Sequence, residues 1–410
     1  PAYVAAAKRL AEELRALGAE VTLQPVKVPH WVRGAESAEL VDSPGRPEGL
    51  TQRLALTALG GSGATPAAGV TARLVVVHDL DELKARAAEV KGAIVLITQT
   101  FDERLAQNGY AGTAYGDGAR IRFAGPAEAS ALGAVAALTR SIGGANFRLP
   151  HTGHTGFKEK TPIPAASLSA EDADLVTRLA AQGPVKLHLT LTPKTLPDTD
   201  AFNVIADWRG TEKPEEYVIV SGHLDSWDLG TGALDDGVGV YASAGVLQTL
   251  SQLKLHARRT IRFIAWANEE NGLRGAKQYL TSVAKTLEHH VAVIETDAGG
   301  GRALGVSAAV TLESFPQLQP LAALLRPIGA NVLERSDRAR GADISVLEEA
   351  GVPGFSPLLD ARTYFDYHHT AADTFDKVDP ENLRSQVATL SVLAFFLADL
   401  EQPLPRFKTP

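Results

Sequence analysis

The sequence predicts an α/β protein built on a doubly wound, mostly parallel sheet with an inserted second domain, and three observations support this. From residue 202 onward, short apolar runs alternate with helical stretches, at 217–221, 260–267 and 291–295. Such strands are buried on both faces, as in parallel sheets covered by helices. Between about residues 51 and 195 the pattern of apolar runs and helical stretches differs from that of the later residues, which indicates a separate, inserted domain. Finally, 410 residues with 45% hydrophobic and 21% charged side chains suit two to three globular domains.

Composition excludes several classes of protein. The chain has 40 Lys and Arg against 48 Asp and Glu, a net charge of −8, which argues against nucleic-acid binding through phosphate neutralisation. No apolar run in the sequence approaches the roughly 18 residues that a membrane span needs. The absence of cysteine removes disulfides, thiolate nucleophiles and cysteine-ligated zinc.

The first part of the main domain is expected at residues 1–50. Apolar residues recur at helical spacing from Tyr3 to Leu17, and Gly18 supplies a helix stop. Alternating apolar residues at 20–28 predict a strand that follows this helix.

Residues 51–195 are expected to form a compact module with its own core. A helix is expected at 80–90, flanked by two short apolar runs that predict strands. Further helices are expected at 126–138 and 170–181. A proline-rich stretch at 192–199 (TPKTLPDT) predicts a linker back to the main domain.

The second part of the main domain is expected at residues 196–410. It closes on a long helix at 380–400, with Asp379 as N-cap and Pro380 at the first helical position. Two further helices are expected at 238–250 and 273–287.

Polar side chains follow three of the predicted strands, in the motifs GHLD, NEENG and TDAG. In an open α/β sheet, ligands bind outside the carboxyl ends of the strands, so these side chains are expected to meet. The stretches GTGALDDGVG and YHHTAADT add further carboxylate and histidine side chains. Together these motifs supply His223, Asp225, Asp235, Asp236, Glu269, Glu270, Asp297, His368 and His369.

Carboxylates crowded at one edge repel each other and are costly to desolvate, and cations offset that cost. Histidine and carboxylate without cysteine suit zinc or a similar divalent ion. One ion would leave surplus carboxylates, whereas two ions about 3.5–4 Å apart share a bridging one. The sequence therefore predicts a metal site that gathers His223, Asp235, Glu270, Asp297 and His369.

Other catalytic motifs are missing from the sequence. It has no HExxH, no G-x-S-x-G and no phosphate-loop lysine, which weakens thermolysin-like, serine-hydrolase and nucleotide-binding interpretations. His151 and His154 lie in a glycine-rich loop, and His289 and His290 at a helix end; none of the four is expected to have a catalytic role.

The motifs GHLDSWDLGTGALDDG, AWANEENG, ETDAGG and YHHTAADT resemble those of the co-catalytic di-zinc exopeptidases of the aminopeptidase and glutamate carboxypeptidase superfamily. With PHWVRG, they are similar to its carboxypeptidase Q branch, and the resemblance runs over most of the chain. It implies a zinc exopeptidase fold with an inserted protease-associated lid. It also implies two Zn²⁺ per chain, a homodimer and an extracytoplasmic or secreted location.

The resemblance also implies a role for each metal-site residue. His223 and Asp297 stand at the ligands of the first metal, and Glu270 and His369 at those of the second. Asp235 stands at the carboxylate that bridges the two metals.

Three neighbouring carboxylates receive other roles. By the resemblance, Glu269 is the general base and Asp225 orients the ring of His223, which its carboxylate can reach from two residues away. Asp236 is expected at the start of the following helix, facing its dipole.

The implied reaction is hydrolysis of short peptides, most of all dipeptides, by a metal-activated water. Glu269 would take the proton of that water and return it to the leaving amine. A lid over the strand ends would leave a cleft open to dipeptides and closed to folded protein. Three alternatives stay open: an aminopeptidase on the same fold, a single-zinc glutaminyl-cyclase-like acyl transferase, and a metal-free binding module.

An exopeptidase must also hold one terminus of its substrate. Asp343 is a candidate for binding a free amine. Arg340, Tyr364 and His368 are candidates for binding a free carboxylate. Behaviour like that of the carboxypeptidase Q branch requires the carboxylate anchor, so a free C-terminus is expected to be required.

Overall fold

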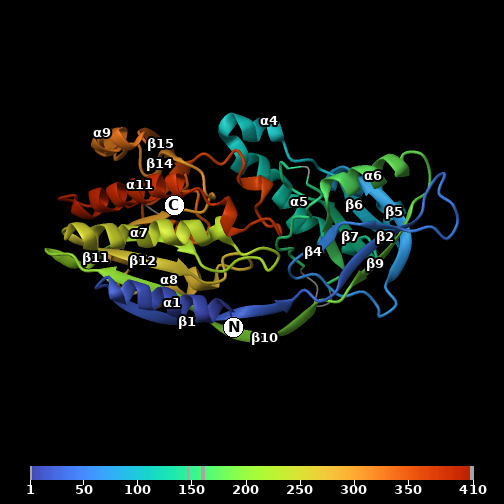
Figure 1. The fold of residues 1–410 in the computed structure, drawn as a ribbon, viewed down its shortest axis with the longest axis horizontal. Helices are drawn as coiled ribbons and strands as arrows, with labels where there is room; N and C mark the ends of the chain where they lie inside the picture. Colours follow the sequence, from blue (N-terminus) through green and yellow to red (C-terminus); the bar gives the residue numbers. More distant parts are fainter. Residues whose placement is uncertain (1, 146, 158–161, 407–410) are drawn as a thin grey trace. The chain divides into compact units, whose positions relative to one another are not determined.

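The computed structural model describes residues 2–145, 147–157 and 162–406, and its contacts divide the chain into two units (Figure 1). Unit 1 comprises Pro1–Val28, Thr199–Tyr364 and Asp373–Pro410, and unit 2 comprises Pro29–Asp198 and Phe365–Ala372. The predicted module of 51–195 lies inside unit 2, which begins earlier and also takes in a short segment near the C-terminus. Within the described residues, no helix is long and apolar enough to cross a membrane.

Unit 1 is built on an eight-stranded mixed sheet with the order β1-β10-β12-β11-β13-β16-β14-β15. The strands are β1 (Glu20–Val32), β10 (Lys194–Trp208), β11 (Lys213–His223), β12 (Arg259–Trp266), β13 (His290–Glu295), β14 (Ala303–Ala309), β15 (Val332–Ser336) and β16 (Gly354–Leu359). The central strands β12, β11, β13 and β16 run parallel, as the buried apolar runs predict. Strand β10 pairs antiparallel with β12, and β14 antiparallel with β16.

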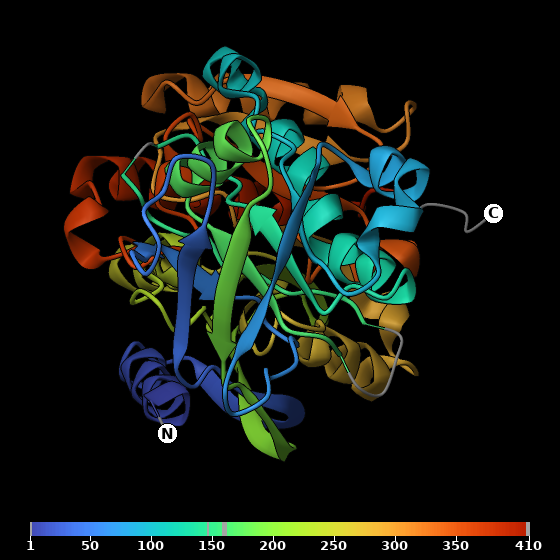
Figure 2. The same cartoon turned by 90° about the vertical axis from the view of Figure 1, so that its right-hand side faces the viewer.

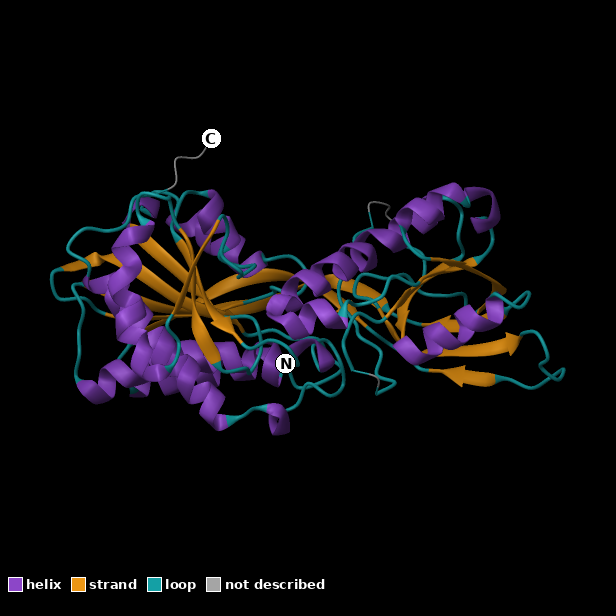
Figure 3. Cartoon of the chain, turned by 90° about the horizontal axis from the view of Figure 1, so that it is seen from above, coloured by secondary structure: helices purple, strands orange, loops and turns teal. Residues whose placement is uncertain are grey.

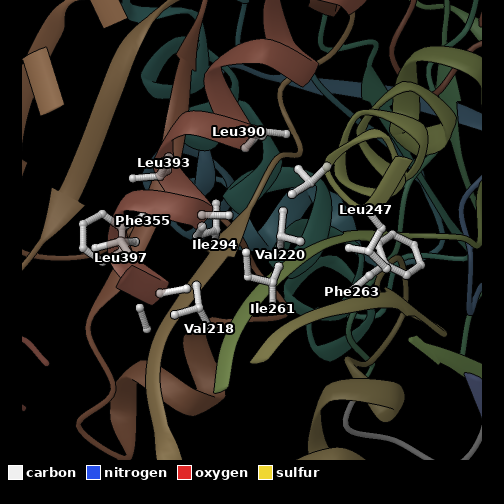
Figure 4. Close-up of a cluster of buried hydrophobic side chains, with 14 of the residues drawn as sticks. Val218, Val220, Leu247, Ile261, Phe263, Ile294, Phe355, Leu390, Leu393 and Leu397 are labelled. Atoms are coloured by element: carbon white, nitrogen blue, oxygen red, sulfur yellow. The ribbon is translucent and has the colours of Figure 1, made fainter. Parts of the chain in front are cut away.

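Helices cover both faces of this sheet. Helices α1 (Ala2–Ala16), α7 (Val238–Leu253), α9 (Gln319–Leu325) and α11 (Pro380–Asp399) contribute to one core cluster, and α8 (Arg274–Val283) and α10 (Ser345–Glu349) to another. Figure 4 shows Leu390, Leu393 and Leu397 of α11 in the first cluster, together with Val218 and Val220 of β11. The predicted start of α11 is confirmed, because the Asp379 side chain accepts hydrogen bonds from the first turn.

Short helical turns join these elements. They are η2 (Ala233–Gly237), η3 (Leu287–His289), η4 (Phe315–Leu318), η5 (Arg326–Ile328), η6 (Tyr364–Asp366) and η7 (Phe375–Lys377). The first of them lies directly before α7 and carries Asp235 and Asp236.

Unit 2 has a second eight-stranded sheet, with the order β3-β2-β9-β5-β6-β7-β8-β4 (Figure 2). The strands are β2 (Glu36–Asp42), β3 (Gln52–Leu54), β4 (Leu56–Ala58), β5 (Val70–Val77), β6 (Ile94–Ile97), β7 (Ala136–Arg140), β8 (Ala165–Leu168) and β9 (Lys186–Leu191). The helical elements are α2 (Leu80–Ala85), α3 (Ala87–Val90), α4 (Glu103–Leu105), η1 (Ala106–Tyr110), α5 (Ala111–Ala131) and α6 (Ala170–Ala180), drawn in purple in Figure 3. The predicted module with its own core is consistent with the separate apolar clusters of this unit.

One sequence prediction within unit 2 is wrong in detail. The helix expected at 126–138 runs instead over Ala111–Ala131, and Ala136–Arg140 forms a strand buried between β6 and β8. The helix contains glycines that lower its intrinsic propensity, but Gly118 and Gly125 pack closely against Ile142 and Ile97. The stretch 192–199, expected as a linker, contains the boundary between unit 2 and unit 1, and it is extended as part of β10 from Lys194 onward.

Candidate active site

Three parallel neighbouring strands of unit 1 end at the same edge of the sheet. His223 is the last residue of β11, paired with Trp266 at the end of β12. Glu269 and Glu270 follow β12, and Asp297 follows β13. The carboxyl ends of adjacent parallel strands therefore deliver these polar side chains to one edge, where α/β sheets bind their ligands.

His223, Asp235 and Asp297 face one another at this edge. Nε2 of His223 lies 3.1 Å from Oδ1 of Asp235 and 3.7 Å from Oδ1 of Asp297. One donor atom of each residue lies within 4.8 Å of the others. Burial alone would lower the pKa of His223, but the two carboxylates outweigh it and raise that pKa well above its ordinary value. An imidazole nitrogen with two carboxylate oxygens is a donor set that fits a zinc ion.

The ring of His223 is held by the backbone of Asp225. Nδ1 lies 2.8 Å from the Asp225 carbonyl oxygen, whereas the Asp225 carboxylate is 4.0 Å away. A carbonyl can only accept, so a proton is assigned to Nδ1, and Nε2 is the ring nitrogen that faces the two carboxylates. The orienting contact therefore differs from the one expected of the Asp225 side chain.

The carboxylate of Asp225 instead organises the loop after β12. Its oxygens accept the backbone N–H groups of Glu269 at 3.0 Å and Glu270 at 3.3 Å. Burial raises the pKa of Glu269 well above its ordinary value, and the neighbouring charges of Glu270 and Asp297 raise it further. Glu269 thus has a high proton affinity in a loop that Asp225 fixes.

Asp236 has a structural role that the sequence analysis missed. Its Oδ2 accepts the backbone N–H of His223 at 3.0 Å, and its side chain is 1% exposed. It lies against Gly222 and Gly239, where an added Cβ would approach its oxygens to 2.5 and 2.1 Å. The peptide bond between Asp235 and Asp236 is cis. The only feature of the sequence that could have indicated this role is an Asp pair followed closely by two glycines.

Asp373 is a second residue that the sequence analysis did not single out. Its carboxylate accepts the N–H groups of Leu234 at 2.6 Å and Asp235 at 3.1 Å. Burial raises the pKa of Asp373 to about 6, despite these hydrogen bonds. Asp373 therefore fixes the turn that carries Asp235. Its place in the motif YHHTAADT was the available signal.

A buried carboxyl pair lies close to the site. Glu295 ends β13, and its Oε2 accepts the N–H of Ile344 at 3.1 Å. Burial raises the pKa of Glu295 to about 8, and the charge of Asp297 raises it further. Burial and Glu295 raise the pKa of Asp343 well above its usual range. Both side chains are fully buried, so Asp343, the candidate amine anchor, lies inside the protein within electrostatic reach of another acid.

The other candidate anchors differ in their surroundings. Arg340 is half exposed and donates to both carboxylate oxygens of Glu334 at 3.2 Å. Tyr364 is 6% exposed, with its ring against Gly299. Burial raises the pKa of Tyr364 well above its ordinary value, and the charges of Asp235 and Asp297 add to this. Tyr364 therefore lies within the electrostatic reach of the candidate metal ligands.

His368 and His369 belong to the segment Phe365–Ala372, which packs with unit 2. Their rings stack with centroids 3.6 Å apart. The structure thus brings together His223, Asp235 and Asp297 within unit 1, with Glu269 and Glu270 in the adjoining loop. The assignment of His369 as a ligand stays a prediction.

Comparison with known proteins places the chain in a family. A family model described as Peptidase family M28 matches residues 203–394. Carboxypeptidase Q of Homo sapiens is 36% identical over 94% of this chain and 78% of its own length. The Xenopus laevis carboxypeptidase Q is 38% identical over 94% of this chain and 79% of its own length.

Solved structures agree with this placement. The crystal structure of a Peptidase M28 precursor from Shewanella amazonensis SB2B matches with a TM-score of 0.90 at 35% identity, over 98% of this chain and 90% of that chain. A zinc aminopeptidase from Bacillus subtilis shares the fold, with a TM-score of 0.68 at 21% identity over 98% of this chain and 93% of that one. The chain therefore belongs to peptidase family M28 and is a metallo-exopeptidase. Within that family it belongs to the carboxypeptidase Q branch.

Proposed function

We propose that this chain is a two-zinc exopeptidase that hydrolyses short peptides, dipeptides above all, and requires a free C-terminus. One observation carries the proposal: Nε2 of His223 faces carboxylate oxygens of Asp235 and Asp297 at 3.1 and 3.7 Å. The carboxypeptidase Q relatives support carboxypeptidase action by their name.

The proposed ligands follow the motifs of the family. His223 and Asp297 would hold the first zinc, Asp235 would bridge, and Glu270 and His369 would hold the second. Bound zinc supplies a water whose pKa is lowered to about 7 and polarises the peptide carbonyl. Asp373 supports this arrangement, because its carboxylate holds the N–H of the proposed bridging residue at 3.1 Å.

Glu269 is the proposed general base. Its raised pKa suits a group that accepts the proton of the attacking water and passes it to the leaving amine. Asp225 positions it by holding the N–H groups of Glu269 and Glu270. The chain's own contribution would therefore be a proton carrier held in place beside the proposed ligands.

Replacing Glu269 tests this assignment. We expect Glu269→Gln to keep the full metal content and lower kcat by about 10²–10⁴-fold, since the amide cannot take a proton. Metal content and turnover of a dipeptide should be measured on the same preparation. Near-normal turnover with full metal would assign the base to another residue.

The free C-terminus is tested with blocked substrates. One dipeptide is compared with its N-acetylated and its C-amidated forms. We expect the amidated form to be refused, because a carboxylate anchor would have nothing to bind. Rapid cleavage of the amide together with refusal of the acetylated form would identify an aminopeptidase. Casein should be degraded far more slowly than the free dipeptide. The homodimer and the extracytoplasmic location stay predictions of the resemblance.

A further inference from the structure

The segment Phe365–Ala372 packs with unit 2, although the residues on both sides of it, Tyr364 and Asp373, belong to unit 1. Backbone hydrogen bonds hold it there. The N–H of Thr152 donates to the carbonyl of His369 at 2.9 Å, and the N–H of Gly144 donates to that of Phe365 at 3.4 Å. We call residues 365–372 the histidine segment.

Aromatic side chains of unit 2 also hold the histidine segment. The ring of Tyr115 stacks on Phe365, with centroids 4.6 Å apart at 16°, and meets His368 edge-on at 4.7 Å. Arg122 is 8% exposed and fixes the Tyr115 hydroxyl through a hydrogen bond of 2.8 Å. These contacts bury rings on both partners and give the segment one preferred position.

His151 adds a buried contact on the other side. Its ring is 4% exposed and faces the backbone of His368. It occupies the space beside Gly143, where an added Cβ would lie 2.1 Å from the imidazole. Burial lowers the pKa of His151 to about 3, and His369 and Arg122 lower it further, so the ring stays neutral.

A contact with unit 2 also determines which ring nitrogen of His369 carries a proton. Its Nδ1 lies 3.2 Å from the carbonyl oxygen of Thr152, which can only accept. The proton is therefore assigned to Nδ1, so that Nε2 is the ring nitrogen with which His369 would bind a metal ion. His369 also has φ of +61°, a conformation costing about 1–3 kcal/mol that surrounding contacts must maintain.

We propose that Tyr115, His151 and the Thr152 carbonyl hold His369 in the tautomer and orientation of a metal ligand. The proposal rests on the proposed function, in which His369 binds the second zinc. Tyr115 and His151 act through His369 and are positioning residues.

The experiment measures zinc affinity of the full chain by chelator competition, with zinc content determined by plasma emission. Tyr115→Leu removes the ring that stacks on Phe365. It should lower the affinity for the second zinc by about 10–100-fold and leave the affinity for the first unchanged. Tyr115→Phe keeps the ring and should restore near wild-type affinity. The matched control is Tyr110→Leu, since Tyr110 lies just before the same helix and is 61% exposed.

A second pair of variants, one test and one control, provides the measurement if Tyr115→Leu fails to fold. His151→Gln should weaken the second zinc in the same way. His188→Gln should not, because that ring contacts Thr71 at 2.8 Å, apart from the histidine segment. A lower melting temperature with unchanged affinity for both zinc ions in Tyr115→Leu or His151→Gln would overturn the proposal, because it would show a purely structural role.

His369→Ala separates this inference from the proposed function. If His369→Ala retains two zinc ions, the proposed ligand assignment fails. If it loses one while the folded Tyr115 and His151 variants bind both ions normally, only the positioning role of these residues fails.

Discussion

Gly239, in the first turn of α7, gives a sharp test of how the site is built. An ideal Cβ on Gly239 would lie 2.1 Å from Oδ1 of Asp236 and 2.3 Å from the carbonyl oxygen of Thr296. The second contact is to backbone, so a rotamer change cannot relieve it. Gly239→Ala must therefore displace either α7 or the Asp236 side chain, which holds the N–H of His223.

The expected magnitude is a balance of two effects. Overpacking a close contact costs about 1–3 kcal/mol, and two contacts this short put Gly239→Ala at the upper end. Alanine regains about 1 kcal/mol over glycine in a helix. We therefore expect a net loss of about 2 kcal/mol in the free energy of unfolding. Zinc affinity should fall as well, because moving Asp236 moves its neighbour Asp235.

The assay is urea unfolding of metal-stripped protein followed by tryptophan fluorescence, with zinc affinity measured separately. Gly112→Ala is the matched control: it lies in α5, and an added Cβ there meets nothing within 4 Å. Its unfolding free energy should equal that of wild type or exceed it by up to about 1 kcal/mol, because only the helix-propensity gain applies there. Wild-type stability and zinc affinity in Gly239→Ala would refute the view that Asp236 links β11 to α7.

Two further predictions concern the loop after β12 and a buried histidine. Asp225→Asn should lower kcat/KM about tenfold with unchanged metal content, because one of the two N–H groups it holds would lose its acceptor; wild-type kinetics would contradict this. His290 is fully buried, and burial lowers its pKa to about 4. Between that value and the ordinary 6.5 the unfolded chain binds more protons, so stability should rise with pH by about 3 kcal/mol. His290→Asn should lack this part of the pH slope; an identical slope would contradict the assignment.

The strand ends that carry the site were predictable from the sequence, because each is a short apolar run followed by a polar motif. The runs at 217–221 and 291–295 fall within β11 and β13, and the run at 260–267 lies in β12 except for its last residue. Burial on both faces leaves such a strand few polar residues, so its end is marked by the first His or carboxylate. His223 and Asp297 stand out in this way, within or just beyond their strands.

The supporting contacts could not be read from the sequence. In the sequence Asp236 resembles an ordinary residue at the start of a helix, and only the structure shows that its carboxylate packs against Gly222 and Gly239. Asp373 acts on Asp235 from 138 residues away in the chain. Strand β14 is rich in alanine, glycine and serine, which gave no strand signal, and the structure shows it paired with β15 and β16. These features depend on tertiary approach, which local patterns do not encode.

The most direct test of the two-zinc account is the number of metal ions bound as the stripped protein is reloaded. Plasma emission and dipeptide turnover should be followed together during the titration with zinc. We expect two zinc ions per chain at saturation, with full activity only when both are bound. Saturation at one ion with full activity would contradict the account and indicate a single-zinc enzyme, and a folded chain that binds none would indicate a binding module.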